Sequence, residues 1–307
     1  MGEETRRSNA VPDWVLAFGP FVVIGAIVVA SFGIVSAFEF DWLTAEGTGN
    51  VLAVLTLIGI VAGILPVFLG MLWFPYIRGL DPTWIHAILA FSAGILTFIA
   101  FEMGDEAIEQ AAAVPDATTG VAVVLVGVIG TITAMEAASR WRRNKAVESG
   151  TEGLRVAYLI AIGLGLHSVG EGLAIGSAFV LGNSGLVVLL TIGFIIHNVT
   201  EGPAVISAVA RDATSPPLRH FVVLGMLAGG GVIVGGWLGS AVDSALLAAA
   251  CFAVAFGAIV QVIWEMRGLI RAEAGTLLTR RTVTAFVVGV AVLFVLEEVI
   301  VDAWLLG

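Results

Sequence analysis

Residues 156–180 read VAYLIAIGLGLHSVGEGLAIGSAFV, and residues 185–210 read GLVVLLTIGFIIHNVTEGPAVISAVA. Each run is apolar except for one short polar island, HSVGEG at 167–172 and HNVTEG at 197–202. At about 1.5 Å per residue, each run as a helix is long enough to cross a hydrocarbon layer of about 30 Å. The two runs therefore predict a pair of consecutive membrane-spanning helices, each with ionisable groups in its interior.

The composition agrees with a membrane protein. Of the 307 residues, 59% are hydrophobic and 12% are charged, whereas soluble domains carry about 25% charged residues. An ordinary soluble enzyme and a disordered chain are thereby excluded. The 14 Lys and Arg against 24 Asp and Glu argue against a nucleic-acid partner, which needs a basic surface. A single Cys excludes a disulfide scaffold.

The whole chain, 1–307, is expected to form one transmembrane domain. Its apolar runs are long and continuous, so helices are favoured over the alternating strands of a barrel. The fold predicted is an all-α polytopic membrane helix bundle with nine transmembrane helices. They are expected at 14–38, 50–77, 83–105, 119–139, 156–180, 185–210, 220–240, 244–266 and 282–304.

The basic residues predict the orientation of the bundle. With nine spans and the N-terminus inside, every Lys and Arg falls on the inner side, as the positive-inside rule expects. We therefore predict a multi-pass protein of the plasma membrane with a cytoplasmic N-terminus and an extracellular C-terminus. The outer loops carry acids instead, which either concentrate cations or only reflect the inward bias of the positive charges.

The four ionisable residues of the islands are expected to lie at similar depth. His167 is 12 residues, about 18 Å, from Arg155, and His197 is 14 residues, about 21 Å, from Arg211. In each island a His and a Glu are spaced i and i+4 and so share one helix face. If the two faces meet, two imidazoles and two carboxylates converge near the middle of the membrane.

Such a cluster calls for a cation. A carboxylate at mid-membrane costs about 2.5–3.5 kcal/mol on insertion scales, and neither segment holds a Lys or Arg. Imidazole nitrogen with carboxylate oxygen suits Zn²⁺, with Fe²⁺, Mn²⁺, Co²⁺ and Cd²⁺ as further candidates. The ligands are expected from both islands, with the Ser and the Asn adding oxygen ligands or holding a water: His167, Ser168, Glu171, His197, Asn198 and Glu201. The alternative without metal is a pair of protonated carboxylates hydrogen-bonded to His.

The islands resemble those of the ZIP (Zrt-/Irt-like protein) family of divalent metal transporters, whose fourth and fifth helices carry His-Asn-x-Pro-Glu-Gly-type motifs at this separation. The resemblance implies an eight-helix core over 50–305, with 14–38 as an extra helix. It further implies a binuclear site between the fourth and fifth helices, homodimers and transport of zinc toward the cytoplasm.

The chain also departs from the family pattern. Ser168 and Gly170 replace the usual Asn and Pro, and Thr200 replaces Pro. The sixth helix of the core has no carboxylate where many relatives place a ligand to the second metal. One well-formed site is therefore expected, with Glu171 and Glu201 shared by any weak second ion.

Three acids mark a possible transport pathway. Glu102, Glu106 and Glu109 fall at i, i+4 and i+7, one stripe at the outer end of a helix. A metal entrance and a solvated outer face both explain this stripe. Glu102 is the deepest of the three, and it lies where relatives often have His.

The sequence thus predicts a carrier of divalent metal, chiefly zinc, and not an enzyme. It lacks a Gly-Lys-Ser/Thr loop, so ATP is not expected as a partner. Two alternatives stay open. One is an intramembrane metal-dependent hydrolase, and the other is a cation-coupled carrier of an organic solute that uses the same carboxylates.

Overall fold

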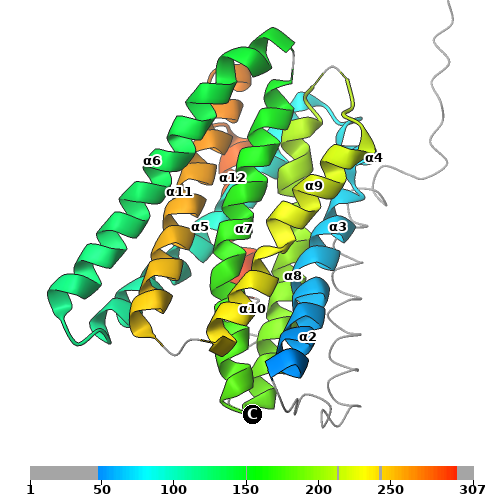
Figure 1. Ribbon diagram of the computed structural model, residues 1–307. Coiled ribbons are helices and arrows are strands. Elements are labelled where there is room, and N and C mark those ends of the chain that lie inside the picture. Colours follow the sequence, from blue (N-terminus) through cyan, green and yellow to red (C-terminus); the bar gives the residue numbers. More distant parts are fainter. Residues whose placement is uncertain (1–47, 150, 213, 242–243, 296–307) are drawn as a thin grey trace, which may run out of the picture. The chain divides into compact units, whose positions relative to one another are not determined.

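A computed structural model describes residues 48–149, 151–212, 214–241 and 244–295, and these residues form helices and short connections (Figure 1). The elements are α2 (Thr48–Gly59), the π-helix η2 (Ile60–Ile64), α3 (Leu65–Met71), α4 (Phe74–Ile77), α5 (Pro82–Ala112), α6 (Ala117–Ser149), α7 (Glu152–Val180), α8 (Ser184–Val209), α9 (Leu218–Gly229), α10 (Gly231–Ala241), α11 (Ala245–Ala274) and α12 (Arg280–Phe294).

Seven helices or near-continuous helical stretches in the described residues are long and apolar enough to cross a membrane. They are Asn50–Ile77, Pro82–Ala112, Ala117–Trp141, Glu152–Val180, Ser184–Val209, Leu218–Ala241 and Ala245–Ala272. The predicted all-helical bundle, with helices long and apolar enough to span a membrane, is thus confirmed for the described residues, whereas the count of nine is not. The segment 14–38 lies outside the described residues, and the segment 282–304 is described only to residue 295, as α12.

Sequence signals place the helix ends. Asp81 caps α5 by accepting a hydrogen bond from the Thr83 N–H at 2.9 Å, and Pro82 occupies the first turn. The tight turn between α7 and α8 needs Gly182, whose φ is +69°, and Asn183 then caps α8. These turns make α7 and α8 neighbours that run in opposite directions.

The basic residues gather at one end of the helices, the upper end in Figure 1, which we call the basic end. The end where α5 meets α6 and α7 meets α8 is called the acidic end, after Glu106, Glu109 and Asp116. Arginines with described side chains at or near the basic end are Arg78, Arg140, Arg155, Arg211, Arg219, Arg267, Arg271, Arg280 and Arg281. Which end faces the cytoplasm stays a prediction.

Polar contacts at the basic end tie α7 to its neighbours. Arg155 of α7 donates to the Ser139 hydroxyl of α6 at 2.7 Å, and this hydroxyl donates to Glu265 of α11 at 2.5 Å. Asp212, which follows α8, accepts from two N–H groups in the first turn of α7, those of Gly153 and Leu154, both at 2.8 Å. Burial raises the pKa of Asp212, although these N–H groups favour its carboxylate.

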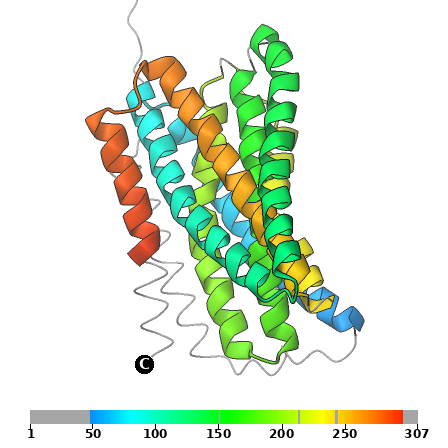
Figure 2. The same ribbon diagram turned by 90° about the vertical axis from the view of Figure 1, so that its left-hand side faces the viewer.

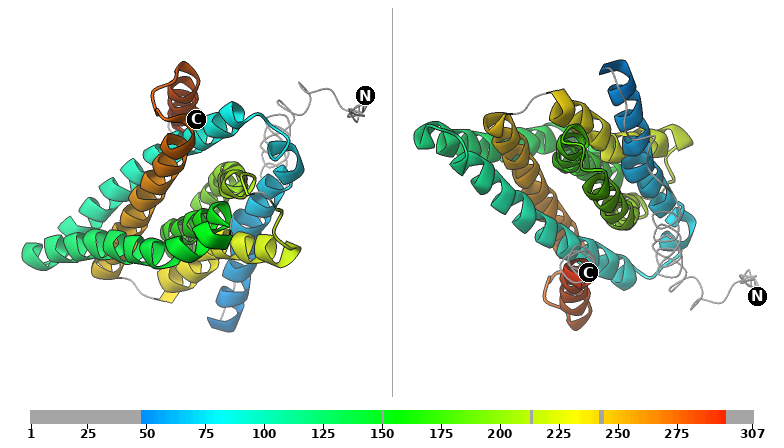
Figure 3. Two further views of the ribbon diagram at one scale, coloured as in Figure 1. Left: turned by 90° about the horizontal axis from the view of Figure 1, so that it is seen from above. Right: turned by 90° about the horizontal axis from the view of Figure 1, so that it is seen from below.

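Helix α7 is the most enclosed of the spans, and it lies with α8 between α3 and α11 (Figure 3). It meets α10 backbone to backbone. A Cβ added at Gly172 would overlap the Val232 carbonyl oxygen, and one added at Gly235 would overlap that of Val169. The pair α5 and α12, side by side in Figure 2, repeats the pattern through Gly94 and Gly289. Such contacts between small residues are a common way for helices to pack closely in lipid.

Gly235→Ala is expected to destabilise the protein by about 1–3 kcal/mol, because its Cβ would meet backbone that has no rotamer to change. Gly130→Ala on α6 is the matched control, since nothing lies within 4 Å of its added Cβ. Thermal unfolding of the purified protein in detergent measures both variants. Equal melting temperatures for the two variants would contradict this account of the α7–α10 contact.

Candidate metal centre

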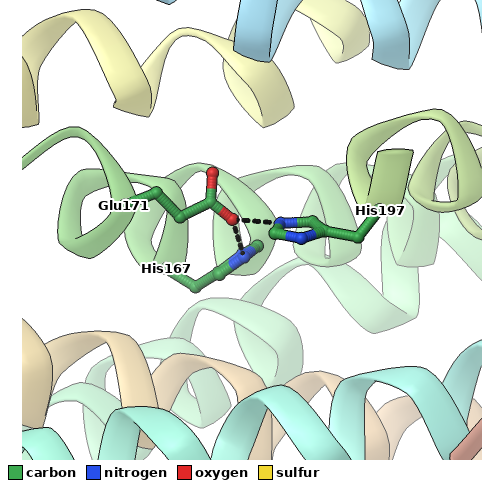
Figure 4. A group of neighbouring side chains, drawn as sticks. All are labelled: His167, Glu171 and His197. Atoms are coloured by element: carbon green, nitrogen blue, oxygen red, sulfur yellow. Dashed lines mark hydrogen bonds and ion pairs between the residues drawn. The ribbon is translucent and has the colours of Figure 1, made fainter. Parts of the chain in front are cut away.

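The two polar islands face each other across α7 and α8. The rings of His167 and His197 lie with centroids 6.0 Å apart, and Glu171 points between them (Figure 4). His167, Glu171, His197 and Glu201 are each no more than 3% exposed. The convergence that the i, i+4 spacing predicts is therefore present, and it lies deep in the bundle.

Glu171 is the centre of this cluster. Its Oε1 atom lies 2.7 Å from His167 Nε2 and 2.5 Å from His197 Nε2, so both imidazoles are within hydrogen-bonding distance of one carboxylate oxygen. The other oxygen, Oε2, accepts from Asn198 Nδ2 at 3.3 Å. One carboxylate thus joins donors from two helices that run in opposite directions.

The antiparallel course of α7 and α8 arranges the four residues in two levels. On α7 the Glu lies nearer the acidic end than the His, and on α8 the order is reversed. Glu171 and His197 therefore form the level toward the acidic end. His167 and Glu201 form the level toward the basic end, with His167 Nε2 3.5 Å from Glu201 Oε1.

Glu201 has unused acceptor capacity. Neither of its oxygens accepts a hydrogen bond from the described residues, although the side chain is only 2% exposed. Buried polar atoms are normally satisfied, and an unsatisfied one calls for an explanation such as an ion. A carboxylate with open lone pairs beside an imidazole is a suitable ligand for a cation.

The donor set fits a borderline divalent metal. One ligand atom each from His167, Glu171 and His197 lie within 4.8 Å of one another. Tetrahedral zinc, with bonds of 2.0–2.2 Å, needs ligand atoms about 3.3 Å apart. Small side-chain rotations would bring these three atoms to that spacing, and Glu201 Oε1 lies beside them, 3.5 Å from His167 Nε2.

A cavity of about 590 Å³ reaches the cluster. Glu171 and His197 line its deep part, while Gln110 and Ser244, at the acidic ends of α5 and α11, also line it. The cavity therefore runs from the acidic end to the nearer of the two levels. His167 and Glu201 are not among its lining residues and lie behind that level.

Packed apolar side chains close the other side. Leu164 of α7, Val205 of α8 and Ile259 of α11 lie toward the basic end from the cluster, belong to one core cluster and are each 0% exposed. Met266, also 0% exposed, continues this packing along α11. In this structure the site thus has access from the acidic end and a closed core on the basic side.

Ser168 and Asn198 occupy equivalent positions in the two islands, and both donate to backbone. The Ser168 hydroxyl donates to the Ala228 carbonyl at 3.3 Å, next to the junction of α9 and α10. Asn198 Nδ2 donates to the Ala62 carbonyl of η2 at 3.0 Å. Each residue therefore joins the site to a neighbouring interrupted helix.

The acidic stripe of α5 divides between two environments. Glu102 and Glu106 line the cavity, and Glu106 accepts from Gln110 Nε2 at 2.8 Å. Glu109 is exposed and does not line the cavity. The cavity also uses Met103 and Phe252, which fill the space beside Gly170. Sequence analysis did not single out these two, since a Met and a Phe in apolar helices carry no distinguishing signal.

No protein-family model matches the sequence, and no curated protein matches it. The resemblance of the two islands to those of the ZIP family therefore rests on the motif residues alone.

Cysteine labelling tests the one-sided access. Ser177 lines the cavity, whereas Ser207, which follows His197 at the same spacing as Ser177 follows His167, is 0% exposed. In a Cys251→Ser background, which removes the single native thiol, Ser177→Cys is expected to react with a water-soluble maleimide and Ser207→Cys to stay unlabelled. Labelling is followed by the mass shift of the intact protein. Equal labelling of the two would contradict the closed core.

Proposed function

We propose that this chain carries divalent metal ions, chiefly Zn²⁺, across a membrane through the cluster of His167, Glu171, His197 and Glu201. The observation that supports this most strongly is the convergence of two imidazoles and two carboxylates inside a bundle of membrane-span-like helices. The proposal follows the ZIP family in its direction, toward the cytoplasm, and in its use of homodimers.

Charge balance supports a cation as the ligand. Glu171 and Glu201 are buried in apolar helices, and residues 156–210 contain no Lys or Arg. Each carboxylate at such depth costs about 2.5–3.5 kcal/mol unless it is compensated. A divalent ion compensates both at once and uses the open oxygens of Glu201.

The form of the cavity supports transport. A water-accessible route leads from the acidic end to the cluster, and packed side chains close the basic side. A carrier exposes its site to one side of the membrane at a time. Access on one side and closure on the other is the arrangement expected of one such state, with the acidic end assigned to the outside.

Protonation of the cluster's ligand atoms accounts for release of the metal. Metal ligands must be free of protons, so metal binding and proton binding compete at the same atoms. In the arrangement seen here, both Nε2 atoms lie within hydrogen-bonding distance of Glu171 Oε1. Rebuilding those hydrogen bonds offsets part of the cost of losing the metal.

Flux into proteoliposomes tests the proposal. Purified protein is reconstituted around a fluorescent zinc indicator, and the initial rate of Zn²⁺ entry is measured. Glu171→Gln and Glu201→Gln remove a ligand charge at each level and are expected to lower the rate at least about tenfold. Fe²⁺, Mn²⁺, Co²⁺ and Cd²⁺ added outside measure selectivity by competition.

Glu109→Gln is the matched control, because Glu109 is an exposed acid that does not line the cavity. It is expected to transport as the unaltered protein does. Unchanged zinc flux in Glu171→Gln would overturn the proposal. Tight zinc binding with hydrolysis of a lipid or peptide and no flux would favour the hydrolase, and metal-independent solute flux would favour the organic-solute carrier.

A further inference from the structure

Pro66 interrupts the first described span next to the site. It lies in the first turn of α3, directly after the π-helix η2. Proline has no backbone N–H, so the carbonyl four residues earlier, that of Ala62, loses its α-helical donor. In this segment the Leu65 N–H bonds to the Ile60 carbonyl, five residues back rather than four. Ala62, whose carbonyl lacks an α-helical donor, thus lies inside the wide turn that the Leu65–Ile60 hydrogen bond closes.

The Ala62 carbonyl finds its donor on another helix. Asn198 Nδ2 of α8 lies 3.0 Å from the Ala62 oxygen, and both residues are 0% exposed. A freed carbonyl in a membrane helix is normally satisfied by a polar side chain of a neighbour. The bond is held in register because α3 and α8 touch through backbone nearby, where a Cβ on Gly70 or Gly202 would overlap the other helix.

This bond fixes which way the Asn198 amide faces. The carbonyl of Ala62 and the carboxylate of Glu171 are both acceptors, so the group between them must be the NH₂, which has two hydrogens to donate. Asn198 Nδ2 lies within 3.3 Å of both. The side chain therefore directs its nitrogen, and not its oxygen, at Glu171.

The consequence falls on Glu171. Its Oε2 is engaged by Asn198, and this leaves Oε1 as the oxygen that lies between the two imidazoles. Partners of this kind orient metal ligands and typically change metal affinity by about 10–100-fold when they are removed.

We propose that Asn198 is a positioning residue rather than a ligand of the ion at Glu171, and that Pro66 acts through it by leaving the Ala62 carbonyl open to its amide. This inference rests on the proposed function, because it describes how the metal-binding carboxylate is held. It assigns to the proline of α3 a part in metal affinity without any contact with the metal.

Substitution of Asn198 by Asp separates a positioning residue from a ligand. An aspartate oxygen is a stronger metal ligand than an amide oxygen, but a carboxylate cannot donate to Ala62 or Glu171. Asn198→Asp is therefore expected to raise the Kd for Zn²⁺ by about 10–100-fold, measured by isothermal titration calorimetry on the purified protein in detergent. An unchanged or tighter Kd would overturn the proposal.

A double-mutant cycle tests the part of Pro66. Pro66→Ala restores an N–H that can bond to the Ala62 carbonyl in place of Asn198, and it is expected to weaken zinc binding about tenfold. In an Asn198→Ala background the same change is expected to alter the Kd less than twofold, because the residue through which Pro66 acts is gone. A purely structural role for Pro66 predicts the same fold-change in both backgrounds, and that result would overturn the proposal.

The melting temperature of each variant shows whether it is folded, and only folded variants enter the comparison. Should Asn198→Asp fail to fold, the cycle of Pro66→Ala and Asn198→Ala decides the proposal alone. Zinc binding by the unaltered protein distinguishes failure of the proposed function from failure of the positioning inference. If it binds no Zn²⁺, the proposed function fails; if it binds Zn²⁺ and Asn198→Asp binds as tightly, only the positioning inference fails.

Discussion

The arrangement depends on one contact, the carboxylate oxygen of Glu171 that two imidazoles from opposite-running helices share. This contact can exist only if α7 and α8 approach closely with both islands at one depth, and the short turn at Gly182 makes them neighbours in sequence and in space. Because residues 156–210, which carry both islands, contain no Lys or Arg, the four side chains must satisfy one another or hold a cation. Burial thus turns a small polar cluster into a site for positive charge.

Glycine contacts and helix interruptions in the helices around the cluster hold the cluster in place. Helix α7 meets α10 through glycines, and α3 meets α8 through Gly70 and Gly202, so the positions of these helices are set by backbone rather than by adjustable side chains. At two places a polar side chain of an island donates to a backbone carbonyl at or beside an interruption in a neighbouring helix: Asn198 at η2 and Ser168 beside the α9–α10 junction. These hydrogen bonds therefore connect the site to η2 and to α9 at the places where the regular helices are interrupted.

Sequence reasoning located the four central residues, their common depth and their meeting, because the i, i+4 spacing and the helical rise are properties of a single helix. It did not find the contact of Asn198 with Ala62, which requires knowing which helix lies against α8. A signal was present in Pro66, since a proline within an apolar span leaves a carbonyl in need of a donor. It also grouped Glu109 with Glu102 and Glu106, because periodicity alone does not say which part of a helix borders a cavity and which part faces outward.

The reversed order of His and Glu on the two helices has a consequence for any ion that traverses the bundle. Arriving from the acidic end, it first meets an acid from α7 with an imidazole from α8; approaching from the basic end, it would first meet an imidazole from α7 with an acid from α8. The pair of functional groups is the same from either direction, with the helices exchanged. A duplicated motif on two antiparallel helices thereby gives the cluster a local two-fold character that neither copy has by itself.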